Sequence, residues 1–179
     1  ISKIKLIPGE EDTGIIFKRV DLKENNIIQA NFKNVSSARL CTTLKNNFGA
    51  TVSTVEHLLA AFYITGIDNV IIETNNVEIP IMDGSSKDFV NLINQSGIKV
   101  MSAKRKFLKI LKKVELLDNE KSITIEPNNE GLDVDFELGY NNEIIGNQKN
   151  HINFNNTKIE EVYTSRTFCL FEDVEKIKN

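Results

Sequence analysis

The segment from Ser53 to Gly66 constrains the fold more than any other part of the sequence. Its apolar residues recur at the i, i+3, i+4 and i+7 spacing of one helix face, at Val55, Leu58, Leu59 and Phe62. Ser53 and Glu56 have the Ser-x-x-Glu spacing of a capping box, and Gly66 suits the left-handed residue that ends a helix. We therefore expect a helix from Ser53 to about Ile64, with its apolar face packed on a sheet.

Short apolar segments on both sides of this helix predict strands. Residues 4–7 and 15–20 are separated by a polar turn and predict antiparallel strands. Residues 70–73 and 77–81 flank an Asn-Asn turn and predict a hairpin. A second helix is expected over residues 86–96, ended by a glycine. Together these elements predict a sheet with two helices.

A short basic connection, residues 102–106, precedes a second run of strand patterns, and we interpret it as a solvated linker rather than a nucleic-acid patch. Residues 132–138 alternate as in a half-exposed strand, and a long polar loop then leads to a helix for which Thr157 is a candidate cap. We expect an α+β fold of two similar two-layer domains, each a mostly antiparallel sheet with helices packed on one side. The first domain is expected at residues 1–101 and the second, incomplete one at 107–179.

Both ends of the sequence look interrupted. The alternation of Ile4 and Leu6 puts the chain already inside a strand at Ile1, so we expect the first domain to lack its N-terminal strand. Residues 173–177 read as the opening turn of a helix. We therefore expect this chain to be part of a longer protein.

The composition excludes several classes of function. A net charge of −3 and a pI near 5.5 give no general attraction to nucleic acid or anionic membrane. No apolar run approaches the roughly 20 residues that span a bilayer, and no signal peptide opens the chain, so a cytoplasmic location is expected. Cys41 and Cys169 lie far apart, which argues against a disulfide framework or zinc ribbon, and we expect both to be small buried residues.

Glu56 and His57 are the residues best suited to chemistry. At about 100° per residue, with Val55 at zero, His57 falls near 200° and points away from the apolar face. The positive end of the helix favours the neutral imidazole that binds zinc, and a carboxylate beside it can act as a general base. The same two residues can also be an exposed histidine and a capping carboxylate, which is the simpler interpretation of these residues alone.

Four stretches, in this order, carry a resemblance to a known family. They are residues 51–61 (Thr-Val-Ser-Thr-Val-Glu-His-Leu-Leu-Ala-Ala), 66–69 (Gly-Ile-Asp-Asn), 78–85 (Glu-Ile-Pro-Ile-Met-Asp-Gly-Ser) and 165–168 (Ser-Arg-Thr-Phe). In order and spacing they resemble the UDP-3-O-acyl-N-acetylglucosamine deacetylase family. The resemblance implies a bacterial cytoplasmic zinc enzyme that removes acetate from a UDP-linked acylated N-acetylglucosamine. That reaction is the committed step toward lipid A of the outer membrane.

The resemblance also implies roles for individual residues. His57 would be one of three zinc ligands, and Glu56 would be the base that deprotonates zinc-bound water. Thr167 would stabilise the oxyanion, Phe168 would line the substrate pocket, and Thr43 matches a position close to the metal. Phe168 can also be a core residue, and Thr43 can be a strand filler.

Other family features have no counterpart in the chain. These are a His-Lys-x-x-x-Asp segment with two metal ligands, a later proton-donating histidine, and an opening Gly-Ile-Gly-Leu-His-Ser-Gly segment. His151 matches no ligand and is expected at the surface. Because zinc needs at least three protein ligands, we expect the others outside this sequence and the chain alone to be inactive. The alternatives are a non-catalytic module that binds a sugar nucleotide or a protein, and a zinc hydrolase acting on another acetamide.

Overall fold

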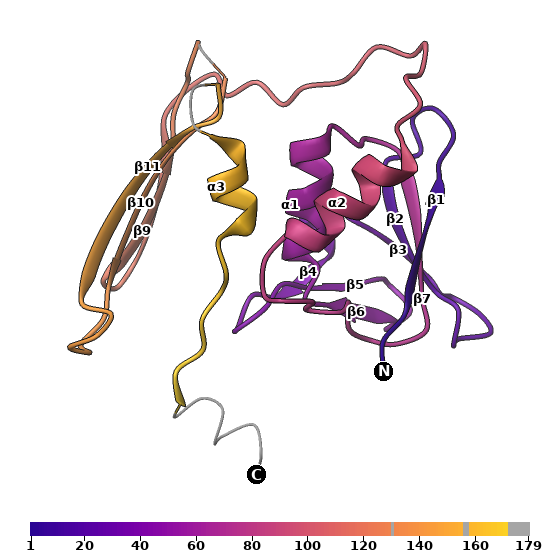
Figure 1. Cartoon of the computed structure of the whole chain (residues 1–179), viewed down its shortest axis with the longest axis horizontal. Helices are drawn as coiled ribbons and strands as arrows, with labels where there is room; N and C mark the ends of the chain where they lie inside the picture. Colours follow the sequence, from indigo (N-terminus) through magenta and orange to yellow (C-terminus); the bar gives the residue numbers. More distant parts are fainter. Residues whose placement is uncertain (130, 156–157, 172–179) are drawn as a thin grey trace. The chain divides into compact units, whose positions relative to one another are not determined.

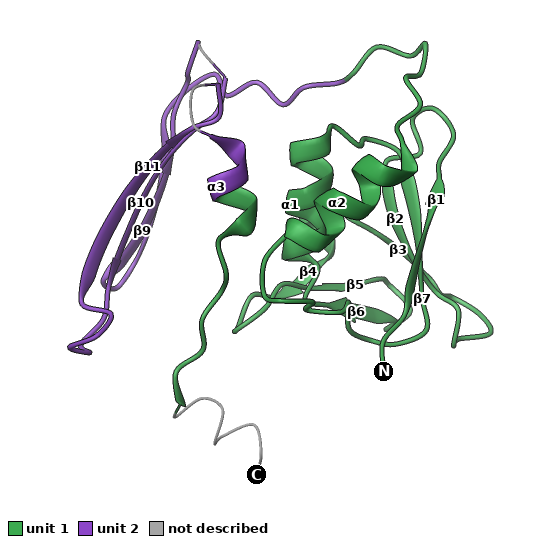
Figure 2. Ribbon diagram, in the orientation of Figure 1, with its two compact units in different colours: residues 1–105, 162–179 green, residues 106–161 purple. Residues whose placement is uncertain are grey.

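The computed structural model describes residues 1–129, 131–155 and 158–171. The chain divides into two compact units, shown in Figure 2. Unit 1 comprises Ile1–Arg105 with Val162–Asn179, and unit 2 comprises Lys106–Glu161. Residues 162–171 thus group with unit 1, whereas the predicted domains place them in the second half. The predicted domain limits stay a prediction, because compactness alone does not test independent folding.

Unit 1 is built on a four-stranded sheet of order β1-β7-β2-β3. Its strands are β1 (Ile4–Pro8), β2 (Ile15–Arg19), β3 (Ile27–Gln29) and β7 (Val70–Thr74). β7 runs antiparallel to β1 and parallel to β2, so the sheet is mixed. The first two strands form as predicted, but they are not neighbours. β7 lies between β1 and β2, and its residues Val70, Ile72 and Thr74 are buried.

A second sheet in unit 1 has three short antiparallel strands, β4 (Val35–Ser37), β5 (Thr43–Lys45) and β6 (Thr51–Ser53), preceded by the 3₁₀ turn η1 (Phe32–Asn34). The predicted hairpin of residues 70–73 with 77–81 is wrong. The backbone of residues 77–79 bonds instead to β6, where Ser53 forms an isolated parallel bridge with Glu78. The Asn-Asn turn therefore redirects the chain to the second sheet.

Two helices cover the four-stranded sheet. Figure 1 shows α1 (Glu56–Thr65) and α2 (Lys87–Ser96) beside each other over it. The helices end at Gly66 and Gly97, as predicted, and Gly66 has the left-handed conformation expected of it, with φ of 72°. The buried core combines sheet and helix residues, among them Phe17, Ile28, Ile72, Leu58, Phe62, Phe89 and Ile93. Burying each such side chain stabilises the fold by roughly 1.5–3 kcal/mol.

Unit 2 contains two separate two-stranded antiparallel sheets. One joins β8 (Val114–Asp118) to β9 (Lys121–Ile125), and the other joins β10 (Asp133–Gly139) to β11 (Asn147–Asn153). The strand pattern expected from Phe107 onward begins only at Val114. β11 was predicted as polar loop, because its Asn, Gln, Lys and His side chains show no alternation; its pairing with β10 makes it a strand. The strands and helices together confirm the α+β class.

Helix α3 (Ile159–Thr164) follows β11, as expected from the sequence. The predicted cap Thr157 and the predicted helix at 173–177 lie outside the described residues. Both cysteines are free, but Cys41 is half-buried and Cys169 is exposed, so the expected burial of both is wrong. In the described ranges, no helix combines the length and the apolar character needed to cross a bilayer.

Candidate active site at the start of helix α1

Glu56 and His57 follow a strained turn between β6 and α1. Thr54, in this turn, has φ of 59°, in the left-handed region that a β-branched residue rarely adopts. Such conformations cost of the order of 1–3 kcal/mol. The Thr54 residue is buried, and its hydroxyl donates a hydrogen bond of 2.8 Å to Oε1 of Glu78. This turn lets the chain leave the strand at Ser53 and enter the helix at Glu56.

The Glu56 carboxylate is oriented by a loop rather than by a helix cap. Its Oε2 accepts a hydrogen bond of 3.0 Å from the backbone N–H of Thr42. The predicted capping box is wrong, because the helix cap is Val55, which makes no side-chain cap bond, and the Ser53 hydroxyl bonds Thr43 instead. The Glu56 carboxylate is thus fixed in position by a hydrogen bond and is partly buried. It lies in the first turn of α1, where the helix dipole favours negative charge.

His57 is partly buried, in keeping with its predicted place outside the apolar face. Its carbonyl accepts a hydrogen bond of 2.9 Å from the Ser86 hydroxyl, and the Ser86 N–H donates to the Tyr163 carbonyl at 3.1 Å. Within the described residues, no hydrogen bond or ion pair involves the His57 ring. The starts of α1 and α2 and the end of α3 are therefore linked through Ser86.

The loop before α2 contacts the segment that contains Thr167. The Thr167 N–H donates to the Gly84 carbonyl at 2.9 Å, and Gly84 has φ of +85°, which favours glycine. Asp83 accepts hydrogen bonds from the hydroxyl and N–H of Ser85 at 2.6 and 3.0 Å. These bonds, with weaker help from the nearby Arg166 guanidinium, hold the pKa of Asp83 below its ordinary value. The loop therefore presents a carboxylate beside a cation.

Thr167 and Phe168 lie at the surface of unit 1. Phe168 is 52% exposed, so it is not a core residue in this structure. Thr43 lies in β5, where its hydroxyl is 3.0 Å from that of Ser53 and 3.8 Å from Cys41 Sγ. In the part of the chain that the structure describes, no hydrogen bond or ion pair joins Glu56 or His57 directly to Thr167.

The structure thus brings together three segments that are far apart in the sequence: the start of α1, the loop of residues 82–86, and residues 163–167. The chain matches the LpxC family, UDP-3-O-acyl N-acetylglycosamine deacetylase, over residues 1–179. The chain belongs to this deacetylase family. The resemblance carried by the four sequence stretches is therefore confirmed.

Relatives within the deacetylase family support the assignment. The UDP-3-O-acyl-N-acetylglucosamine deacetylase of Nautilia profundicola is 40% identical over 178 residues, which cover 99% of this chain and 60% of that protein. Those of Blochmanniella floridana and Haemophilus ducreyi are 38% and 37% identical, covering 98% and 99% of this chain and 60% and 59% of theirs. The chain spans about 60% of the length of these relatives.

The described residues do not form a metal site by themselves. Among them, no group of three or more His, Cys, Asp or Glu side chains is placed to hold a metal ion. His151, the other histidine, belongs to unit 2, where it is exposed and its Nδ1 lies 2.8 Å from Asp135 Oδ1. Its predicted surface position is confirmed. A zinc site needs at least three protein ligands, and His57 alone is too few.

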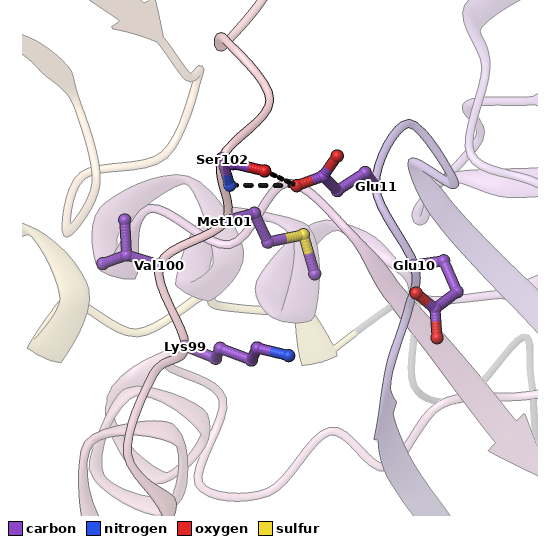
Figure 3. Close-up of a pocket in the computed structure, with 6 residues that line it drawn as sticks. All are labelled: Glu10, Glu11, Lys99, Val100, Met101 and Ser102. Carbon is purple, nitrogen blue, oxygen red and sulfur yellow. Dashed lines mark hydrogen bonds between the residues drawn. The ribbon is translucent and has the colours of Figure 1, made fainter.

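A surface pocket of unit 1 lies apart from these residues. Figure 3 shows its lining, Glu10, Glu11, Lys99, Val100, Met101 and Ser102, which includes none of the predicted site residues. The Glu11 carboxylate accepts hydrogen bonds from the hydroxyl and N–H of Ser102 and the N–H of Ala103, at 2.7, 2.9 and 3.1 Å. These bonds lower the pKa of Glu11. They tie residues 102–103 to the β1–β2 turn, so we regard this pocket as structural.

The sequence does not predict the part that three residues play at this site: Thr42, Thr54 and Ser86. The N–H of Thr42 carries no sequence signal, because any residue but proline provides one. The left-handed φ of Thr54 cannot be predicted either, because Gly, Asn and Asp are the residues that indicate a left-handed position in a sequence. Ser86 was placed correctly at the start of α2, but its contact with His57 depends on tertiary packing.

Proposed function

We propose that this protein hydrolyses the acetamide of a UDP-linked 3-O-acyl-N-acetylglucosamine, in the pathway to lipid A. The observation that supports it most is the Glu56 carboxylate, held by the Thr42 N–H in the first turn of α1 and adjacent in sequence to His57. It lies in the residue 51–61 stretch that resembles the deacetylases, which are the relatives at 37–40% identity. Acetate release by a positioned carboxylate base is therefore the proposed reaction.

In this proposal Glu56 acts as the general base. It takes a proton from the water that attacks the acetamide carbon, since a fixed carboxylate within hydrogen-bond reach is suited to that step. The C–N bond then breaks, and the amine leaves with a proton from the later histidine that the family resemblance implies. The Thr167 hydroxyl donates a hydrogen bond to the oxygen that becomes negative in the transition state. Thr43 and Phe168 are proposed to contact the substrate. The exposed ring of Phe168 offers apolar surface for an acyl or sugar group.

We further propose zinc as the cofactor, with His57 as one ligand and the others outside the described residues. When bound, zinc would polarise the acetamide carbonyl and lower the pKa of water toward about 7. Cytoplasmic location is proposed on the same family grounds. The 179-residue chain alone is expected to release no acetate, because the described residues offer a single proposed ligand.

Glu56→Gln in the complete gene product tests this function. The amide keeps the size and can still accept the Thr42 hydrogen bond, but it cannot take a proton. We expect kcat for acetate release to fall by about 10²–10⁴-fold with little change in KM. Glu10→Gln, in the surface pocket, is the matched control and should leave kcat unchanged.

Other outcomes separate the competing functions. A Glu56→Gln enzyme with near wild-type kcat would return Glu56 to a structural role. A complete wild-type protein that binds the UDP-sugar but releases no acetate would favour the binding module. Release from a simple acetamide but not from the UDP-sugar would favour a hydrolase with another substrate.

A further inference from the structure

Thr54 and Glu78 meet at the point where the chain turns toward the candidate base. Thr54 stands two residues before Glu56 and is 6% exposed. Its hydroxyl lies 2.8 Å from Oε1 of Glu78, and with a carboxylate it must be the donor. A hydrogen bond to an ionised group is roughly twice as strong as one between neutral groups. This contact therefore binds the turn to the segment of residues 77–79.

The backbone already fixes where these two segments lie. The Ser53 N–H donates to the Val77 carbonyl at 2.8 Å, and the Ile79 N–H donates to the Ser53 carbonyl at 3.0 Å. The backbone thus holds residue 78 opposite residue 53. The Glu78 side chain reaches Thr54, which follows residue 53 in the sequence. These backbone hydrogen bonds end at Ser53. The hydrogen bond from the Thr54 hydroxyl to Glu78 continues the contact into the turn.

The conformation of Thr54 explains why a stabilising hydrogen bond is needed in this turn. A β-branched residue disfavours the left-handed region, so Thr54 by itself favours an extended conformation that would redirect the start of α1. Glu56 receives its hydrogen bond from Thr42, on a different segment, so a redirected helix start would move the carboxylate from that donor.

We propose that Thr54 and Glu78 form a positioning pair that holds the Glu56 carboxylate in place for hydrolysis, an inference that rests on the proposed function. Neither residue contacts the reacting atoms in this role. A misplacement of about 1 Å can lower a rate by about 10²-fold, which sets the size of effect to expect.

Four variants of the complete protein test the pair. Thr54→Val keeps the shape but removes the donor, and Glu78→Met keeps the length but removes the acceptor. Thr54→Ser and Glu78→Gln keep a donor and an acceptor oxygen. With rates normalised to the folded fraction, we expect kcat to fall about 10- to 100-fold in Thr54→Val and Glu78→Met, with KM within about threefold. Thr54→Ser and Glu78→Gln should recover most of kcat.

Two kinetic results overturn the proposal: wild-type kcat in Thr54→Val and Glu78→Met, or equal losses in all four variants. A second measurement does not depend on activity. Crystal structures should show residue 54 left-handed in Thr54→Ser and Glu78→Gln, and displaced in Thr54→Val and Glu78→Met. If residue 54 stays left-handed in the Thr54→Val structure and Glu56 keeps its hydrogen bond from the Thr42 N–H, the positioning proposal is wrong. This result holds even if the wild-type protein is inactive. Wild-type inactivity, by contrast, removes only the proposed function.

Discussion

Units 1 and 2 contain similar strand patterns but bury them very differently. The buried hydrophobic core found in the structure lies entirely in unit 1, between Phe17 and Ile93. In unit 2, no described residue is buried, and β8 and β9 are exposed along their whole length. The strands of unit 2 thus form by pairing without being buried, because burial of a sheet requires a second layer to cover it.

The register within unit 2 makes the contrast specific. Val114 pairs with Ile125 and Leu116 pairs with Ile123, so the four side chains share one face of the β8–β9 sheet. They are 56%, 49%, 65% and 60% exposed, respectively. In unit 1, Ile72 has the same chemistry but is fully buried, because helices cover its sheet. The same residue types thus contribute to stability in one unit and little in the other.

Amide hydrogen exchange on the 179-residue chain should show the largest difference. Amides of β7 should exchange only through global opening, whose free energy is typically about 5–15 kcal/mol. Amides of β9 should exchange through local opening, at least about 10³-fold faster after correction for intrinsic rates. Equal protection of the two strands would mean that unit 2 has a stabilising layer of its own.

Truncation of a phenylalanine in each unit should show the next largest effect. Phe17→Ala empties a fully buried site, so we expect a loss of about 3–5 kcal/mol in the free energy of unfolding. Phe136→Ala, at a residue 54% exposed, should change it by no more than about 0.5 kcal/mol. Urea unfolding followed by circular dichroism measures both. Similar losses would contradict the assignment of the core to unit 1.

Two left-handed glycines offer a finer comparison. Gly66 has φ of +72° and Gly146 has φ of +53°, so alanine at either site meets a backbone penalty of about 1–2 kcal/mol. We expect Gly66→Ala to lower the unfolding free energy of unit 1 by about that amount, because it ends α1. Gly146→Ala should disturb only unit 2. If it also shifts the unit 1 transition, the two units unfold together.

The smallest expected effect is the pH dependence of the hydrogen bonds that Glu11 accepts from residues 102–103. Its hydrogen bonds from Ser102 and Ala103 lower its pKa below the ordinary 4.5, so the ionised form stabilises unit 1. That contribution is complete above the ordinary pKa and is lost as the pH falls through the lowered one. Glu11→Gln should therefore lower the thermal midpoint slightly at about pH 7, with the difference from wild type shrinking as the pH falls through the lowered pKa of Glu11.

The neighbouring Glu10→Gln serves as the control for this measurement, because it lines the same pocket outside these hydrogen bonds. A Glu11→Gln difference that persists unchanged in acid would show that the carboxylate charge is not the cause. Unit 2 amides should exchange at the same rate in both variants.

Much of unit 1 could be predicted from local pattern. The two helices and their terminal glycines were predicted because helical periodicity and left-handed glycines are properties of short segments. The pairing of β1 with β7 could not be predicted in this way, because residues 4–8 and 70–74 are neighbours in the sheet but far apart in the sequence. The polar strand β11 was missed for a related reason, since its pairing partner and not its composition makes it a strand.

The candidate site divides in the same way. The helix pattern made Glu56 and His57 candidates, and the family resemblance then implied their roles and added the Arg-Thr-Phe segment, because both kinds of signal are read along the sequence. Tertiary structure alone decided that Thr42 holds the Glu56 carboxylate and that Thr54 turns left-handed against Glu78. It also decided that Gly84 accepts a bond from Thr167. The physical reason is that propensity depends on near neighbours along the chain, whereas these contacts depend on which distant segments packing brings together.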